Sequence, residues 1–270
     1  MFDSHTHTDN SDDCMQDLDG LCSYAIRKGL SGICITDHVD IPSSKRTNAY
    51  QRIKSSHKAV DAARAKYGDK LTIFKGVELA EGFLDSDYTK SILALPDLDV
   101  VIGSLHRTLM EDVNTFYSLI DFSGFTSNFL NNYFRKYLSE VLYTAENSDI
   151  DILAHLTCPL RYINGKYGKG IDVNNHMDII EKILFAIIKR NIALEINTSG
   201  LYSFYGEYMP PLNVVEMYYN LGGRLITLGS DAHIAQNVGK AFSETKEKLK
   251  AIGFSEYYYY KKRQPFCIKI

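Results

Sequence analysis

The sequence lacks the cysteine pattern of a disulfide framework or of a cysteine-based zinc site. It has five cysteines, an odd number, and no two of them stand in Cys-x-x-Cys spacing. Disulfide-stapled domains usually carry an even number of cysteines, and structural zinc sites use closely spaced pairs. We therefore expect reduced and mostly buried thiols at Cys14, Cys22, Cys34, Cys158 and Cys267.

Long apolar runs, a targeting leader and an excess of charge are also missing. No run approaches the ~18 consecutive apolar residues of a membrane-spanning helix, and the N-terminus has no charged, apolar leader ending in small residues. The formal net charge is only −3, so the composition indicates no general attraction to nucleic acid. Tryptophan is absent too, which excludes no class of function. We expect a cytoplasmic protein without a membrane or nucleic-acid partner.

Short apolar runs alternate with amphipathic stretches along the 270 residues. The runs are rich in Ile, Val and Leu, which is typical of strands buried on both faces of a parallel sheet. Seven strands are predicted, at Met1–His7, Leu30–His38, Leu71–Leu79, Leu98–His106, Ile150–His155, Asn191–Asn197 and Arg224–Asp231. Helices are predicted between them, at Asp17–Lys28, Ala49–Tyr67, Asn128–Asn147, Val173–Arg190, Leu212–Leu221 and Gly239–Ile252.

Repeated strand–helix units predict a parallel α/β architecture. Seven strands suit a TIM-like barrel with one unit missing better than an open sheet. No linker or shift in composition divides the chain, so we expect one domain over residues 1–270. Two irregular stretches rich in Tyr and Phe, Thr108–Asn128 and Ser199–Pro211, are expected to form loops over the site. Tyr257–Tyr260 and the basic residues after it are expected to form a packing segment with a solvated end.

Side chains that bind metals follow the predicted strands. The first strand holds His5 and His7, whose side chains point to the same face because strand side chains alternate. Every later strand also ends in His, Asp, Glu or Asn, and in a barrel all these ends converge on the face that carries the active site. Six of the eight histidines belong to this set, whereas His57 and His176 fall in helices and are expected to be structural.

The number of candidate ligands exceeds what one metal ion needs. A catalytic zinc ion takes three or four protein ligands, so nine candidates suit two or three divalent ions. Glu78 is a natural bridging carboxylate, and zinc, manganese and iron all fit imidazoles beside carboxylates. The candidates are His5, His7, Asp13, His38, Glu78, His106, His155, Asp231 and His233.

The order of these motifs resembles that of the PHP (polymerase and histidinol phosphatase) family. The motifs are His-Thr-His-Thr at 5–8, Thr-Asp-His at 36–38, Gly-x-Glu at 76–78, Gly-Ser-x-His at 103–106, Ala-His at 154–155 and Ser-Asp-Ala-His at 230–233. The resemblance spans residues 1–239 and implies a distorted (β/α)₇ barrel with its metal site at the carboxyl-terminal rim.

The resemblance also implies three metal positions. The first would use His5, His7, Glu78 and Asp231; the second Glu78, His106 and His155; and the third Asp13, His38 and His233. For the third position the sequence offers both Asp12 and Asp13, and the spacing from His5 favours Asp13.

Size and single-domain organisation are similar to the stand-alone phosphatases of that family, which hydrolyse L-histidinol phosphate in histidine biosynthesis. The implied mechanism is in-line attack by a metal-bridging hydroxide, with Glu78, Asp231 and His233 as catalytic residues and Asp231 or His233 as proton donor. The alternatives are another phosphoesterase of the family, acting on phosphotyrosine or nucleic acid, and a non-catalytic metal-binding module.

Charged residues near the strand ends are candidates for substrate binding. Arg161 and Arg107 follow His155 and His106, and an arginine fork suits bidentate phosphate binding. Glu81 and Asp85 follow Glu78 and would pair with the ammonium group of a histidinol substrate. Asn197 would contact the metal ligands without binding a metal ion itself.

Overall fold

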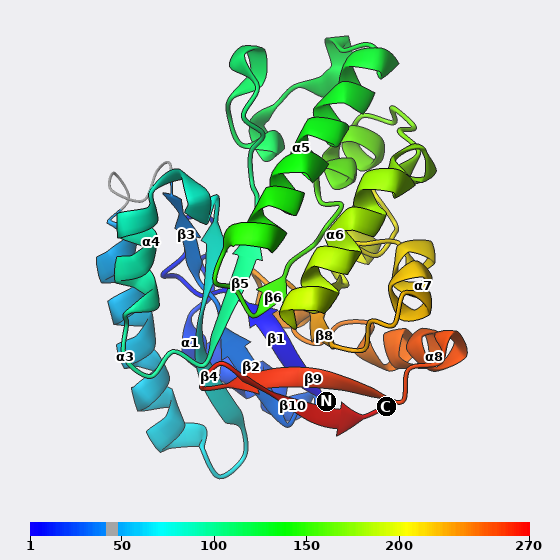
Figure 1. The fold of residues 1–270 in the computed structure, drawn as a ribbon. Helices are drawn as coiled ribbons and strands as arrows, with labels where there is room; N and C mark the ends of the chain where they lie inside the picture. Colours follow the sequence, from blue (N-terminus) through cyan, green and yellow to red (C-terminus); the bar gives the residue numbers. More distant parts are fainter. Residues whose placement is uncertain (42–47) are drawn as a thin grey trace.

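The computed structural model describes residues 1–41 and 48–270, and its centre is one mostly parallel sheet (Figure 1). The strands pair in the order β1-β2-β4-β5-β6-β7-β8-β9-β10, and β3 pairs with β4 beside this path. Every pairing is parallel except that of β9 with β10. The strands are β1 (Phe2–Thr6), β2 (Gly32–Ile35), β3 (His38–Asp40), β4 (Thr72–Ala80), β5 (Val100–Ser104), β6 (Ile152–Leu153), β7 (Ala193–Asn197), β8 (Ile226–Gly229), β9 (Glu256–Lys261) and β10 (Gln264–Lys269).

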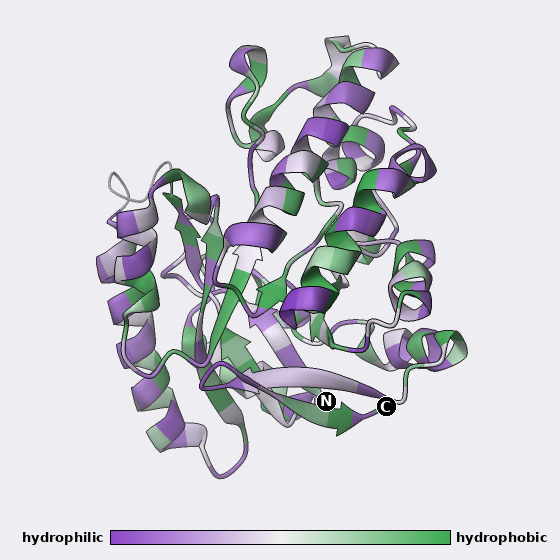
Figure 2. Cartoon of the chain, viewed as in Figure 1, coloured by the Kyte–Doolittle hydropathy of each residue, from purple (hydrophilic) through white to green (hydrophobic). Residues whose placement is uncertain are grey.

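Helices connect the parallel strands and cover the outside of the sheet. Their outward faces are hydrophilic, whereas β2 and β4 are largely hydrophobic (Figure 2). Asp17 and Thr126 cap the first and the longest of these helices, accepting hydrogen bonds from Gly20 N–H and Phe129 N–H. The helices are α1 (Leu18–Arg27), α3 (Ala49–Tyr67), α4 (Ser86–Leu93), α5 (Ser127–Asn147), α6 (Met177–Arg190), α7 (Leu212–Asn220) and α8 (Phe242–Ile252).

The first strand meets the segment that follows β8, and this brings the two ends of the motif series together. Thr6 and Ala232 form a parallel bridge, and His7 N–H donates to the Ala232 carbonyl at 3.0 Å. Asp231 N–H donates to the His5 carbonyl at 2.9 Å. The parallel strands therefore form a distorted (β/α)₇ TIM-like barrel, in which β1 to β8, apart from the short β3, correspond to the seven predicted strands.

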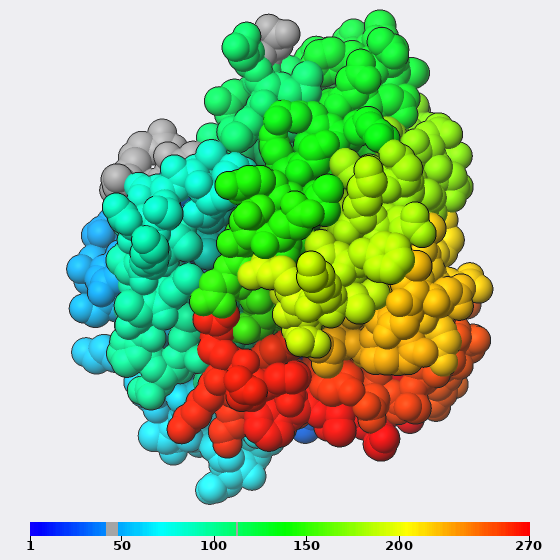
Figure 3. Space-filling model, in the orientation of Figure 1, coloured from blue at the N-terminus to red at the C-terminus, as the bar shows by residue number. Residues whose placement is uncertain are grey.

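A C-terminal hairpin was not predicted. β9 and β10 are joined by Lys262 and Arg263, which both have left-handed backbone, with φ 50° and 62°. Such turns favour glycine and asparagine, so Lys-Arg gave no hairpin signal. Phe2 N–H donates to the Tyr257 hydroxyl at 3.0 Å, and the Phe2 ring stacks on Tyr259. The hairpin covers the end of the barrel opposite the carboxyl-terminal rim, along the lower edge of the molecule (Figure 3).

Two smaller differences concern the region after β4. The chain forms α4, whose N-cap is Asp85, and the Asp85 carboxylate accepts a hydrogen bond from Tyr88 N–H at 3.0 Å. In the structure the Asp85 carboxylate therefore caps a helix. All five cysteines are free, four of them buried, as predicted. Among the described residues, no helix is long and apolar enough to span a membrane.

Candidate metal centre and active-site cavity

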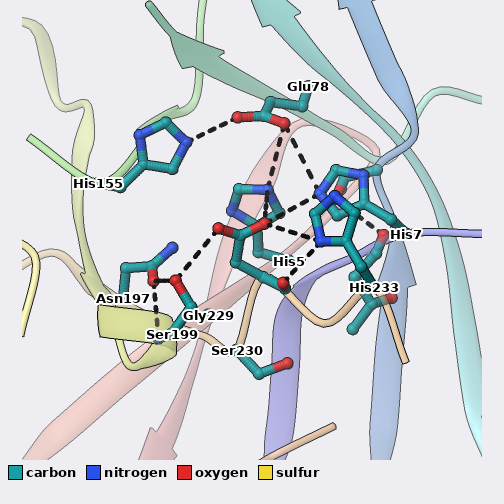
Figure 4. Close-up of polar contacts among 12 residues, drawn as sticks. His5, His7, Glu78, His155, Asn197, Ser199, Gly229, Ser230 and His233 are labelled. Carbon is teal, nitrogen blue, oxygen red and sulfur yellow. Dashed lines mark hydrogen bonds and ion pairs between the residues drawn. The ribbon is translucent and has the colours of Figure 1, made fainter. Parts of the chain in front are cut away.

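The first cluster joins both ends of the chain at the rim of the barrel (Figure 4). His5 and His7 leave the same face of β1, and their Nε2 atoms lie 3.8 and 3.3 Å from Asp231 Oδ1, which follows β8. Glu78 Oε2 from β4 lies 3.5 Å from His5 Nε2 and 3.7 Å from His7 Nε2. Both histidines and Glu78 are fully buried.

The other carboxylate oxygen of Glu78 faces a second pair of histidines. His155 Nε2 lies 2.8 Å from Glu78 Oε1, and His106 Nε2 lies 3.1 Å from the same oxygen. His38 Nδ1 approaches Glu78 Oε2 at 2.7 Å. Glu78 therefore lies between the clusters, where a bridging carboxylate was expected.

A third cluster lies nearer to solvent. Asp13 places its carboxylate 3.5 Å from His38 Nε2 and 3.3 Å from His233 Nε2. The neighbouring Asp12 instead forms an ion pair with Arg52 of α3. The structure thus brings Asp13, and not Asp12, to the two histidines.

Several buried polar atoms at the centre of these clusters have no hydrogen-bond partner. They are His5 Nε2, His7 Nε2 and Glu78 Oε2, which face one another across the first cluster. Leaving such atoms unpaired is costly unless something else satisfies them. Imidazole nitrogens and carboxylate oxygens are the donors that zinc and similar ions use. The residues therefore fit a divalent metal ion.

Carboxylates hold the far nitrogens of the candidate histidines. His5 Nδ1 lies 2.6 Å from Glu195 Oε1, and His106 Nδ1 lies 2.6 Å from Asp40 Oδ1. Such contacts fix the ring so that Nε2 points to a metal, and they make the imidazole a stronger ligand. The far nitrogen of His7 lies 3.2 Å from the Ser11 hydroxyl, which itself donates to the buried Asp37 at 2.9 Å.

Burial and neighbouring charges shift the pKa values of this cluster. Burial alone lowers the pKa of His5, but the carboxylates of Glu195 and Glu78 outweigh it and hold that pKa well above its usual value. Burial lowers the pKa of His7 strongly, and the neighbouring imidazoles lower it further. Burial would raise the pKa of Glu78, but the surrounding imidazoles hold it well below the usual range. His7 is thus neutral and Glu78 anionic, the forms that bind metals.

Two residues of the clusters have unusual backbone. His155 and Asp231 lie in the left-handed region, with φ 24° and 50°. For residues other than glycine this conformation costs about 1–3 kcal/mol and persists only where surrounding contacts enforce it. His155 N–H donates to Glu195 Oε2 at 2.8 Å, and Asp231 N–H donates to the His5 carbonyl, so both conformations are held by hydrogen bonds at the site.

A cavity of about 380 Å³ opens beside the clusters. Its walls include Phe116 and Tyr117 from the first predicted loop, but none of the aromatic residues of 199–211. Arg161 is part of the wall, and its guanidinium donates to the Ser199 hydroxyl at 3.3 Å.

Glu81 and Arg107 lie elsewhere than expected, since neither lines this cavity. Glu81 is buried, and its carboxylate accepts hydrogen bonds from the backbone N–H groups of His106 and Arg107. The Arg107 guanidinium lies over the Phe116 ring, 4.5 Å from its centroid. The structure places both residues behind the cavity wall, where they support the segment after β5.

Sequence reasoning assigned no role to several buried carboxylates beneath the clusters. Asp37 accepts hydrogen bonds from Thr8, Ser11 and Ser56, and Asp3 accepts from Ser230 and Gly239. The available signal was their position, since each lies in or directly after a strand, next to a candidate ligand. The structure also keeps His57 and His176 away from the clusters, bonded to the Gly76 carbonyl and to Asn131.

The fold and the site together define an α/β barrel with clusters of imidazoles and carboxylates that fit divalent metal ions at its carboxyl-terminal rim. The model of the PHP domain family matches residues 3–199, and the chain belongs to this family. The chain is 30% identical to a probable histidinol-phosphatase of Thermotoga maritima, over 94% of this chain and 93% of the relative. It is 26% identical to a histidinol-phosphatase of Lactococcus lactis, over 94% of this chain and 92% of that relative.

A solved structure agrees with these relatives. The Lactococcus lactis histidinol phosphate phosphatase, in complex with zinc, L-histidinol and phosphate, superposes with a TM-score of 0.77 and 25% identity. The match covers 98% of each chain. The putative histidinol phosphatase of Listeria monocytogenes shares the fold, with a TM-score of 0.77 over 90% of this chain and 99% of that chain, at 21% identity.

Proposed function

We propose that this protein is a metal-dependent phosphatase that hydrolyses L-histidinol phosphate to L-histidinol and phosphate, a step of histidine biosynthesis. The observation that carries the proposal is the convergence of imidazoles and carboxylates from six strand ends and the first loop on adjoining clusters, whose outer members line a cavity together with an arginine. Relatives and a full-length structural neighbour named for this activity support the substrate.

We propose three metal positions. The first is held by His5, His7, Glu78 and Asp231; the second by Glu78, His106 and His155; and the third by Asp13, His38 and His233. When bound, divalent ions such as zinc, manganese or iron polarise phosphoryl oxygens and supply an activated water at neutral pH. Zinc is supported by the neighbouring structure that contains it.

The chain's own residues then bind and orient the substrate. Arg161 is the proposed phosphate-binding residue, because it lines the cavity and its planar fork matches phosphoryl oxygens. The Ser199 hydroxyl, which contacts the Arg161 guanidinium, limits the directions in which it can point. Phe116 and Tyr117 also line the cavity, and we propose that they exclude water from the substrate.

The leaving alcohol needs a proton, and two residues that line the cavity, His233 and Asp231, are candidate donors. His233 is half-buried and lines the cavity, and its Nδ1 lies 3.0 Å from the Asp231 carbonyl. Asp231 also lines the cavity, and its Oδ2 lies 3.3 Å from the Ser199 hydroxyl oxygen. We propose that one of these two residues protonates the leaving oxygen.

We further propose that residues 1–270 act as one domain in the cytoplasm, with a small phosphomonoester and no nucleic acid or membrane as partner. One sheet contains strands from Phe2 to Lys269, which supports a single domain. The free thiols support a cytoplasmic location, and the near-neutral charge supports the absence of a nucleic-acid partner.

The substrate is tested by assaying the metal-loaded protein against a panel of phosphoesters. Histidinol phosphate, a phosphotyrosine peptide and single-stranded DNA are compared by kcat/KM under identical metal conditions. We expect histidinol phosphate to be preferred by at least about tenfold, which corresponds to about 1.4 kcal/mol of transition-state binding. Equal or better hydrolysis of the peptide or the DNA would refute the proposed substrate, though not the metal centre.

Asp13→Ala is expected to remove one metal ion from the protein, whereas Asp12→Ala is not. Asp13 faces His38 and His233, whereas Asp12, which also lines the cavity, is paired with Arg52. The matched pair is compared by metal content after dialysis, measured by plasma mass spectrometry. A full metal content in Asp13→Ala together with a loss in Asp12→Ala would reverse the assignment.

A further inference from the structure

We infer that Glu195 is a positioning residue that dictates which nitrogen of His5 binds metal and holds His155 in place. Glu195 lies on β7, is 1% exposed, and touches candidate ligands from two other strands. The inference rests on the proposed metal centre, but it concerns a residue that would touch neither metal nor substrate.

Hydrogen-bond donors surround the Glu195 carboxylate. Its Oε2 accepts from His155 N–H at 2.8 Å and from the Asn197 side-chain amide at 3.0 Å. The Asn197 amide cannot turn around freely, because its own oxygen accepts from Ser199 N–H at 2.9 Å and from the Ser199 hydroxyl at 2.7 Å (Figure 4). Both groups that contact Oε2 can therefore only donate hydrogen bonds to it.

The remaining oxygen, Oε1, lies 2.6 Å from His5 Nδ1. A carboxylate can only accept, so His5 must carry a proton on Nδ1. The Nε2 atom of His5, which has no hydrogen-bond partner and lies 3.5 Å from Glu78 and 3.8 Å from Asp231, is then available as a metal ligand.

Glutamine cannot replace Glu195 in either orientation, although it has the same shape. If its NH₂ group faced His155 N–H and Asn197, donors would oppose donors. If the NH₂ group faced His5, Nδ1 would have to accept, and the proton would move to Nε2, where it blocks the metal. The side chain also has little room to move away, because Gly229 lies so close that even a β-carbon there would overlap Glu195 Oε1.

The test is Glu195→Gln in the full chain, stripped with a chelator and titrated with Zn²⁺. We expect the affinity for at least one zinc ion to fall by about 10- to 100-fold, the usual effect of removing the partner of a metal-bound histidine. Cobalt substitution should show a changed visible spectrum for the same position. The matched control is Glu140→Gln, a buried glutamate on α5 that accepts from Leu109 N–H and pairs with Lys136, and its metal content should stay that of the wild type.

A second measurement uses the wild type and does not depend on the variant folding. Long-range ¹H–¹⁵N NMR of the zinc-loaded protein, with His5→Gln to assign the signal, should show a proton on His5 Nδ1 and none on Nε2. A proton on Nε2, or zinc affinity unchanged in Glu195→Gln, would overturn the inference. A wild type that binds no metal would instead refute the proposed function.

Discussion

Glu78→Gln is expected to reduce phosphatase activity by more than about 100-fold and to lower the metal content of the protein. Changing a residue that only hydrogen-bonds a metal ligand costs about 10- to 100-fold, so losing a bridging ligand should cost more. Glu78 Oε1 lies 2.8 and 3.1 Å from the Nε2 atoms of His155 and His106, and Oε2 faces His38, His5 and His7 at 2.7–3.7 Å. An amide supplies one oxygen and a pair of donors, so it cannot serve both sides.

Activity on histidinol phosphate and bound zinc are measured on the same preparations. Far-UV circular dichroism checks that Glu78→Gln still folds, and Glu140→Gln again serves as the control for replacing a buried glutamate. Activity within a few fold of the wild type together with a full metal content would contradict the ligand assignment. Loss of activity with metal retained would instead limit Glu78 to a role in the chemical step.

Gly229→Ala is the second change with a large expected effect. A β-carbon at Gly229 would overlap Glu195 Oε1 and lie 2.9 Å from the His5 β-carbon. Both neighbours are buried and held by other contacts, so the Glu195 and His5 side chains must shift away from β8 to make room. We expect a loss of about 1–3 kcal/mol in the free energy of unfolding, and a loss of metal affinity beyond that which the lower stability explains.

Gly124→Ala is the matched control, because a β-carbon at that position meets no atom within 4 Å. Urea unfolding of the metal-free proteins gives the stability, and zinc titration gives the affinity. Gly229→Ala with wild-type zinc affinity would show that the His5–Glu195 pair tolerates displacement.

The histidines could be located from the sequence because local rules determine their positions. His5 and His7 share a face of one strand, and parallel strands bring His106 and His155 to the same rim. The choice between Asp12 and Asp13 was harder, since both lie in one turn and only its folded geometry shows which carboxylate points inward. The metal-ligand roles of all these residues remain predictions until metal binding is measured.

The carboxylates behind the histidines could not be assigned from the sequence. Glu195 and His5 are 190 residues apart, and nothing in either motif indicates the other. The same holds for the hairpin, whose Lys262-Arg263 turn adopts a conformation that its residue types disfavour and that contacts at the barrel base support. The backbone contacts of Glu81 and Asp85 were equally hidden in the sequence, because an acidic residue near a site can serve the backbone as readily as a substrate.

The contact between β1 and the segment after β8 has a consequence for biosynthesis. Asp3 and Ser230 hydrogen-bond although 227 residues separate them, and the first metal position lies directly above this contact. A ribosome releases the N-terminal histidines first and Asp231 and His233 only when most of the chain has been made. The nascent protein therefore carries His5 and His7 for most of its synthesis without a complete site, and occupation of the proposed first metal position must follow the emergence of Asp231.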